Sequence, residues 1–391
     1  MSNPTVRVTP AGAKSLRGGN PWCYRTEVDR WPDGLEPGAV VDVVDGQKNP
    51  IGQAFAASKS PLALRLLTRK PSREEKIDAD FFARRFEASL ARRASLHHRD
   101  AYRLVHGEAD LLPGLFVDRY GDTLTLQTLS EGADRRKAEW AKVLAKLTGA
   151  RLVVCRDDAS GRDFEGLPRQ KTILLGEEPT VVAFHEGQTR FEIDLVRDSK
   201  TGSFLDQVDN HVRAGELARG EALDTFSYHG GFALALARQC TSVIAVEQDP
   251  TAAERIRENA RANGRHNVTV ETANAFDVLR AYSDEGRRFD AVVLDPPGLA
   301  KRREGMKAAR RAYHELNLRA LKLVKPDGLL VTCSCSGKVS RELFEQLVLG
   351  AAADAKRQVQ ILERRGAGID HPPLGALPET EYLKAWFLRV L

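Results

Sequence analysis

The sequence predicts an α/β protein with an N-terminal β-barrel domain, a small central α+β domain and a C-terminal domain built on a doubly wound sheet. Three observations predict this class. Short β-prone runs between turn residues fill the first ~70 residues, a mixture of strands and helices follows, and from Phe191 onward strands alternate with helices. Such alternation is typical of a parallel sheet covered on both faces. We place the domains at residues 1–72, 73–189 and 190–391.

The N-terminal domain is predicted to be all β. Its strands are expected at 6–8, 39–44 and 62–67, because these runs are rich in Val, Leu and Ala. Gly, Asn, Pro and Asp cluster at 18–21 and 31–34, and these residues suit turns. The pattern indicates a small barrel.

The central domain is predicted to combine helices and strands. Apolar residues at helical spacing indicate a helix over 77–96. The segment 161–187 contains Pro168, Gly176 and Pro179 and is expected to be irregular. The other expected elements are strands at 102–105, 124–129 and 152–155 and a helix at 137–147.

The C-terminal domain is predicted to hold five parallel strands with helices between them. A helix-ending segment, 325–328, precedes the last strand. The strands are expected at 222–226, 243–247, 268–271, 291–294 and 329–332. Polar residues at the carboxyl ends of such strands are the natural place for a site.

Composition excludes several classes of protein. The 391 residues are 42% hydrophobic and 29% charged, as in a globular domain, and no run is long enough to span a membrane. The start has no apolar signal core, so we expect a cytoplasmic protein. The five scattered cysteines form neither a disulfide framework nor a zinc motif, and no metal is expected.

Basic residues cluster although the net charge is only +5. Dense Lys and Arg suit a phosphate backbone, and the alternative is a solvated helix face with compensating acids. The clusters are 84–85, 92–93, 97–99, 135–137, 301–303 and 310–311.

A glycine turn follows the first strand of the C-terminal domain. Asp224 and Phe226 lead into Tyr228, Gly230 and Gly231, which open a helix. Glycine there lets a ligand approach the backbone closely. The residues do not spell G-x-G-x-x-G, so a nicotinamide cofactor is disfavoured.

Polar residues end three more strands. Glu247 ends the second strand, and a carboxylate there suits a ribose diol. Asn274 follows the third and either contacts an adenine or caps the next helix. Asp295, followed by two prolines, ends the fourth and can accept a hydrogen bond from a nucleobase.

Two cysteines end the fifth strand, and residues two apart on a strand share a face. Cys333 fits a buried core thiol. Cys335 lies where the strand opens to solvent and is the candidate nucleophile. No basic partner for its thiolate can be identified from the sequence.

Together these motifs resemble the bacterial large-subunit ribosomal RNA cytosine-carbon-5 methyltransferases that carry an N-terminal PUA domain. Their methyltransferase domain has the Rossmann-like class I fold. The family pattern matches Cys335 and does not require Cys333. The similar stretches are 17–22, 103–115, 117–122, 200–202, 204–207, 224–232, 295–297 and 334–337.

The resemblance implies S-adenosyl-L-methionine as cofactor. Asp224 and the turn from Tyr228 to Gly231 would cradle its methionine part, Glu247 its ribose and Asn274 its adenine. Phe226, Gln207 and Asp295 complete the expected cofactor-binding set. Cys335 and Asp295, with Cys333, are the expected catalytic residues.

The resemblance also implies the reaction and the partner. Cys335 would add to carbon 6 of a cytosine in large-subunit ribosomal RNA, so that carbon 5 attacks the methyl group. Two alternatives stay open: methylation of a base nitrogen without a thiol, and a non-catalytic RNA-binding assembly protein. The PUA-like domain and the basic clusters, especially 301–303 and 310–311, are expected to hold the RNA. The sequence leaves a homodimer open.

Overall fold

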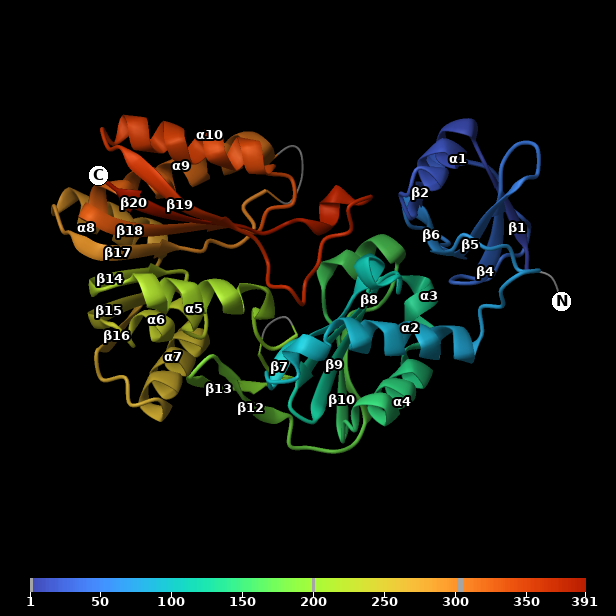
Figure 1. The fold of residues 1–391 in the computed structure, drawn as a ribbon, viewed down its shortest axis with the longest axis horizontal. Coiled ribbons are helices and arrows are strands. Elements are labelled where there is room, and N and C mark those ends of the chain that lie inside the picture. The colour runs from blue at the N-terminus through green and yellow to red at the C-terminus, as the bar shows by residue number, and fades with distance from the viewer. Residues whose placement is uncertain (1–2, 199–200, 301–304) are drawn as a thin grey trace. The chain divides into compact units, whose positions relative to one another are not determined.

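The computed structural model describes residues 3–198, 201–300 and 305–391, and the chain divides into two compact units (Figure 1). The first unit comprises Met1–Phe184, Glu192–Ser203 and Asp370–Pro378. The second comprises His185–Phe191, Phe204–Ile369 and Glu379–Leu391. The boundaries near residues 72 and 189 stay a prediction, because this division follows compactness alone.

The N-terminal region of the first unit forms a sheet in the order β2-β6-β5-β4-β1-β3. The prediction of an all-β region is wrong, because α1 (Pro10–Arg17) lies between the first two strands. Thr9 caps this helix by accepting a hydrogen bond from the Gly12 N–H, and Pro10 occupies its first turn. These two residues indicate a helix start, but the neighbouring β-prone runs led to the prediction of strands alone. The strands are β1 (Thr5–Val8), β2 (Trp22–Tyr24), β3 (Val28–Arg30), β4 (Val40–Val44), β5 (Pro50–Ala56) and β6 (Leu62–Thr68).

The central part of the first unit forms a sheet in the order β11-β10-β9-β8-β7. The helix predicted over 77–96 is shorter in the structure. Helix α2 (Ala79–Arg92) ends at Arg92, and a separate 3-10 turn, Ala94–Leu96, follows it. The segment 161–187 is not irregular, because it contains two strands. The elements are β7 (Ala101–His106), β8 (Leu115–Tyr120), β9 (Thr123–Thr128), α3 (Glu131–Asp134), α4 (Lys137–Thr148), β10 (Leu152–Asp157) and β11 (Gln170–Leu175). Strands β12 (Val181–Glu186) and β13 (Thr189–Asp194) pair as a separate two-stranded sheet, of which His185–Phe191 belongs to the second unit.

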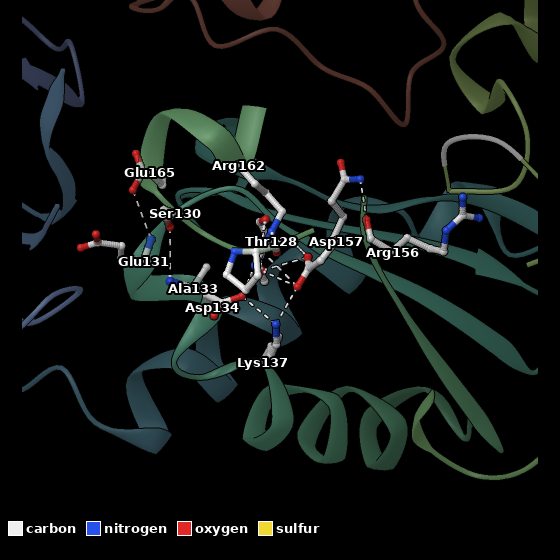
Figure 2. A network of polar contacts seen from close by, with 12 residues as sticks. Thr128, Ser130, Glu131, Ala133, Asp134, Lys137, Arg156, Asp157, Arg162 and Glu165 are labelled. Carbon is white, nitrogen blue, oxygen red and sulfur yellow. Dashed lines mark hydrogen bonds and ion pairs between the residues drawn. The ribbon is translucent and has the colours of Figure 1, made fainter. Parts of the chain in front are cut away.

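A buried polar network connects the elements of this central part (Figure 2). Arg162, fully buried, donates to the Thr128 carbonyl at 2.7 Å and to Asp134 at 2.8 Å. Lys137 bridges Asp134 and Asp157, at 2.7 Å to each. Arg162 and Lys137 therefore each lie against carboxylates, so these two buried charges are compensated and have a structural explanation.

The second unit contains a sheet in the order β16-β15-β14-β17-β18-β20-β19. Its five predicted strands are parallel neighbours, as expected. Two strands that were not predicted, β19 and β20, extend the sheet, and β20 runs antiparallel to both β18 and β19. The strands are β14 (Gly220–Thr225), β15 (Cys240–Glu247), β16 (Val268–Thr272), β17 (Phe289–Leu294), β18 (Val324–Ser334), β19 (Val359–Arg365) and β20 (Lys384–Val390).

Helices cover both faces of this sheet (Figure 1). One face packs against α8 (Ala275–Asp284), α9 (Met306–Leu323) and α10 (Arg341–Asp354), and the other against α5 (Val208–Leu217), α6 (Gly231–Leu236) and α7 (Pro250–Ala262). Parallel pairing brings the carboxyl ends of β16, β15, β14, β17 and β18 to one edge of the sheet. Asp224, Glu247 and Cys333 are among the last two residues of β14, β15 and β18, and Asn274, Asp295 and Cys335 follow the ends of β16, β17 and β18. Gln207 lies before β14, in the 3-10 turn Leu205–Gln207.

The last parallel strand differs in its bounds from the prediction. Helix α9 ends at Leu323 and β18 begins at Val324, so the segment 325–328 lies within the strand. The strand ends at Ser334. Cys333 is therefore a strand residue, and Cys335 lies one residue beyond the strand.

Candidate active site at the carboxyl edge of the second sheet

The turn after β14 has an unusual backbone. Phe226 has φ 62° and Tyr228 has φ 51°, a left-handed conformation that is uncommon outside glycine, and Gly230 has φ 89°. A Cβ atom on Gly231 would lie 2.3 Å from the Cε1 atom of His211, so only glycine fits there. The turn is a shaped backbone cradle at the start of α6.

Asp224 lies beneath this turn and is 1% exposed. Its Oδ2 atom accepts a hydrogen bond from the Ala233 N–H at 3.0 Å. Its Oδ1 atom is buried and has no hydrogen-bond partner among the described residues. Burial raises the pKa of this carboxyl to about 7. A buried acceptor without a partner, beside a glycine cradle, fits a ligand that brings a positive charge or a donor.

His211 on α5 was not found from the sequence. Its Nδ1 atom lies 2.6 Å from Glu186 Oε2, and both side chains are buried. Burial opposes the charged imidazole, but the Glu186 carboxylate raises the pKa of His211. The ring packs edge-on against Phe232 and fixes the start of α6.

Glu247 at the end of β15 ties the turn together. Its Oε2 atom accepts from the Tyr228 N–H at 2.8 Å, and its Oε1 atom accepts from the Asp249 N–H at 2.9 Å. Each carboxylate oxygen can accept a further hydrogen bond. The side chain therefore orients the cradle and can still accept from a diol.

Asn274 caps α8, which is one of the two roles expected for it. Its Oδ1 atom accepts from the Phe276 N–H at 2.9 Å, and its Nδ2 atom donates to Gln248 at 3.1 Å. The ring of Phe276 packs edge-on against Phe226 with centroids 5.8 Å apart. A contact between Asn274 and an adenine stays a prediction.

Asp295, the residue after β17, is oriented by a series of hydrogen bonds between side chains. Gln207 Nε2 donates to Asp295 Oδ2 at 3.0 Å, and Asn210 Nδ2 donates to Gln207 Oε1 at 2.7 Å. Arg365 Nε donates to Asn210 Oδ1 at 2.9 Å. Gln207 was expected at the cofactor, and the structure shows that it orients Asp295.

The two cysteines differ sharply in environment. Cys333 is fully buried, and burial raises the pKa of its thiol well above the ordinary value. Cys335 is partly exposed, and its sulfur lies 3.9 Å from the Pro296 carbonyl oxygen. A Cβ atom on Gly298 would lie 3.8 Å from the Cys335 sulfur. The loop after Asp295 therefore lies against Cys335.

The loop that carries Cys335 is fixed by hydroxyl groups. The Tyr313 hydroxyl lies 2.9 Å from the Ser334 hydroxyl and 2.9 Å from that of Ser336. The Ala300 N–H also bonds to Ser336 at 3.2 Å. Cys335 is thus held between two anchored serines, while its own side chain stays partly open to solvent.

Two other features, a metal-binding cluster and a membrane-spanning helix, are not found among the described residues. Within 3–198, 201–300 and 305–391, no group of three or more His, Cys, Asp or Glu side chains could hold a metal ion. No helix in those ranges is both long and apolar enough to cross a membrane.

Two family models match the chain: a PUA-like domain over residues 6–69, and "Conserved hypothetical protein 95" over residues 185–348. The chain is 35% identical over 397 residues to ribosomal RNA large subunit methyltransferase I of Erwinia tasmaniensis, covering 99% of this chain and 100% of that protein. It is 37% identical over 393 residues to the protein of the same name from Shewanella amazonensis, covering 98% and 99%.

Two solved structures share the fold. A crystal structure described as a methyltransferase complexed with SAH has a TM-score of 0.85 at 18% identity, covering 99% of this chain and 100% of that one. One described as a SAM-dependent methyltransferase from Streptococcus mutans has a TM-score of 0.84 at 18% identity, with the same coverage.

The strand order of the second sheet, the glycine cradle after β14 and the acidic end of β15 define a Rossmann-like methyltransferase with an N-terminal PUA-like domain. Full-length identity of 35–37% narrows this class to one family. The chain belongs to the ribosomal RNA large subunit methyltransferase I family.

Proposed function

We propose that this protein transfers a methyl group from S-adenosylmethionine to carbon 5 of a cytosine in large-subunit ribosomal RNA, through a covalent adduct with Cys335. The observation that carries the proposal is the pairing of Asp295 and Cys335 at the ends of adjacent strands. Cys335 is also the only one of the chain's five cysteines that is not buried.

The residues present fit the cofactor. Bound S-adenosylmethionine supplies an electrophilic methyl group. Asp224 offers its unpartnered Oδ1 atom to the cofactor's ammonium group, and the cradle from Tyr228 to Gly231 receives the methionine part. Glu247 accepts from the ribose hydroxyls.

The chain's own groups then prepare the cytosine. Carbon 5 is a poor nucleophile, so the Cys335 thiolate adds to carbon 6 and makes carbon 5 enamine-like. Asp295, oriented by Gln207, accepts a hydrogen bond from the cytosine edge. After carbon 5 gains the methyl group it loses its proton to a base, the bond between sulfur and carbon 6 breaks, and the ring double bond returns. A base within folded RNA has to be flipped out to reach this edge.

Mass mapping of ribosomal RNA from a deletion strain tests the proposal. We expect one 5-methylcytosine in the large-subunit RNA to disappear and to return when the chain is supplied. A lost methyl group on a purine nitrogen would favour the alternative chemistry without a thiol. An unchanged methylation pattern would contradict a methyltransferase role.

Some residues of the basic clusters that were expected to bind RNA have structural roles instead. Arg93 is buried and pairs with Asp110 at 2.5 Å, and Arg136 lies 4.8 Å over the ring of Phe55. The cluster 301–303 lies outside the described residues. Arg310 and Arg311 are exposed on the first turns of α9, and neither pairs with a carboxylate in the ranges that the structure describes.

We predict that Arg310→Glu and Arg311→Glu each raise the RNA concentration needed for half-maximal turnover by about tenfold, because each removes a phosphate contact and adds repulsion. Steady-state kinetics between 50 and 200 mM salt would measure this, and the salt dependence should weaken. Lys322→Glu is the matched control, since Lys322 lies at the opposite end of the same helix. Equal KM values for all the variants would remove α9 from the RNA surface.

A further inference from the structure

Lys384 is a buried cation beside the candidate nucleophile. It is the first residue of β20, is 1% exposed and is paired in register with Ser334 on β18. Its ammonium group donates to the Ser336 carbonyl and to the Tyr382 carbonyl, at 2.8 Å each. The charge is therefore bonded to the residue that follows Cys335.

The burial of this lysine needs an explanation, because lysine is almost never fully buried without an anionic partner. In the part of the chain that the structure describes, Lys384 forms no ion pair with a carboxylate. Glu381, which faces it more remotely, is bound to Arg341. Neutral carbonyl groups alone leave the ammonium charge uncompensated.

Cys335 is the group that can supply the missing negative charge. A negative charge on Cys335 would favour the charged form of Lys384, whose ammonium group is bonded to the carbonyl of the next residue, Ser336. The Glu381 carboxylate acts on the pKa of Lys384 in the same direction, and Arg341 acts in the opposite direction. Burial lowers the pKa of Lys384 to about 8, so the lysine is still mostly charged at neutral pH. Tyr313 is no substitute, because its hydroxyl is engaged by Ser334 and Ser336.

We propose that Lys384 is a positioning residue whose ammonium group serves as counter-ion to the Cys335 thiolate. The inference deepens the proposed function and rests on it. The thiol proton leaves to solvent, and the cation stabilises sulfur both as the attacking thiolate and as the thiolate that departs from carbon 6. The carbonyl bonds of Lys384 also fix the loop on which Cys335 lies.

Thiol alkylation without RNA or cofactor tests this inference. The rate of iodoacetamide modification of Cys335 would be followed against pH by peptide mass spectrometry, with the four buried cysteines as internal references. In Lys384→Met we expect the pKa of Cys335 to rise by at least one unit, so that alkylation at pH 7 slows about tenfold. Lys384→Arg should retain most of the reactivity.

Lys338→Met is the matched control, because Lys338 is exposed only three residues from Cys335 and its charge is screened by solvent. A purely structural role of Lys384 would change the limiting rate of alkylation and leave the pKa of Cys335 unmoved. An unmoved pKa in folded Lys384→Met would overturn the inference.

A reciprocal measurement covers the case in which Lys384→Met does not fold. Coupling is mutual, so Cys335→Ala should lower the pKa of Lys384, as observed by NMR of the 15N-labelled side chain. No shift there would equally overturn the inference. Because neither readout involves methyl transfer, failure of the proposed reaction would leave both results standing.

Discussion

Cys335→Ala is expected to reduce methyl transfer to ribosomal RNA by at least ~10³-fold, because carbon 5 of cytosine does not react until a nucleophile has added to carbon 6. Turnover would be measured with labelled cofactor and RNA from a deletion strain. Calorimetry should show unchanged cofactor affinity, since Cys335 lies at the end of β18 and the cradle follows β14.

Cys333→Ala is the internal control for this variant. Cys333 is fully buried and holds its thiol in the neutral form, so its loss should lower stability slightly and leave turnover nearly intact. If both alanine variants kept full activity, the thiol mechanism would be wrong and methylation of a base nitrogen would be favoured.

Asp224→Asn is expected to weaken cofactor binding at pH 8 by at least about tenfold. The pKa of Asp224 is raised by burial to about 7, so the carboxyl is mostly protonated at pH 6 and mostly ionised at pH 8. If the ionised form binds the ammonium group, wild-type affinity relative to Asp224→Asn should rise about tenfold between these pH values. The cofactor's own amine titrates equally with both proteins, so the ratio isolates Asp224.

The same substitution, Asp224→Asn, should weaken cofactor binding at pH 8 but increase the stability of the cofactor-free protein. A raised pKa in the folded state means that Asp224 favours folding below its unfolded pKa and loses that contribution as pH rises toward 7. Asp224→Asn should therefore unfold at a higher temperature than the wild type at pH 8. Asp277→Asn, at an exposed carboxyl on α8, is the control and should change neither property. Equal cofactor affinity for Asp224→Asn and the wild type at both pH values would contradict this role.

The parts of the site that follow from local sequence were predictable. Asp224, Glu247 and Asp295 each come at the end of a short apolar run that indicates a buried strand, and parallel pairing then brings these ends to one edge. Helix α1 was missed because its short sequence lies between β-prone runs. The capping residue Thr9 before Pro10 was a signal for a helix start. Strands β19 and β20 were not predicted, and the antiparallel direction of β20 depends on tertiary pairing, which periodicity does not reveal.

The partners that complete the site come from distant parts of the chain. His211 meets Glu186 across 25 residues, and Lys384 meets Ser336 across 48. Nothing in local spacing reveals such contacts. One signal was available for Lys384, which lies within the otherwise apolar run from Leu383 to Leu388, where a buried charge calls for a partner.

Trapping on RNA that contains 5-fluorocytosine tests the central claim most directly. A base removes the proton from carbon 5 of cytosine but cannot remove fluorine, so the bond between sulfur and carbon 6 should persist after methyl transfer. We predict a stable protein–RNA adduct whose peptide map places the RNA on Cys335, present in Cys333→Ala and absent in Cys335→Ala. An active enzyme that forms no adduct, or an adduct on another residue, would contradict the assignment of Cys335 as the nucleophile.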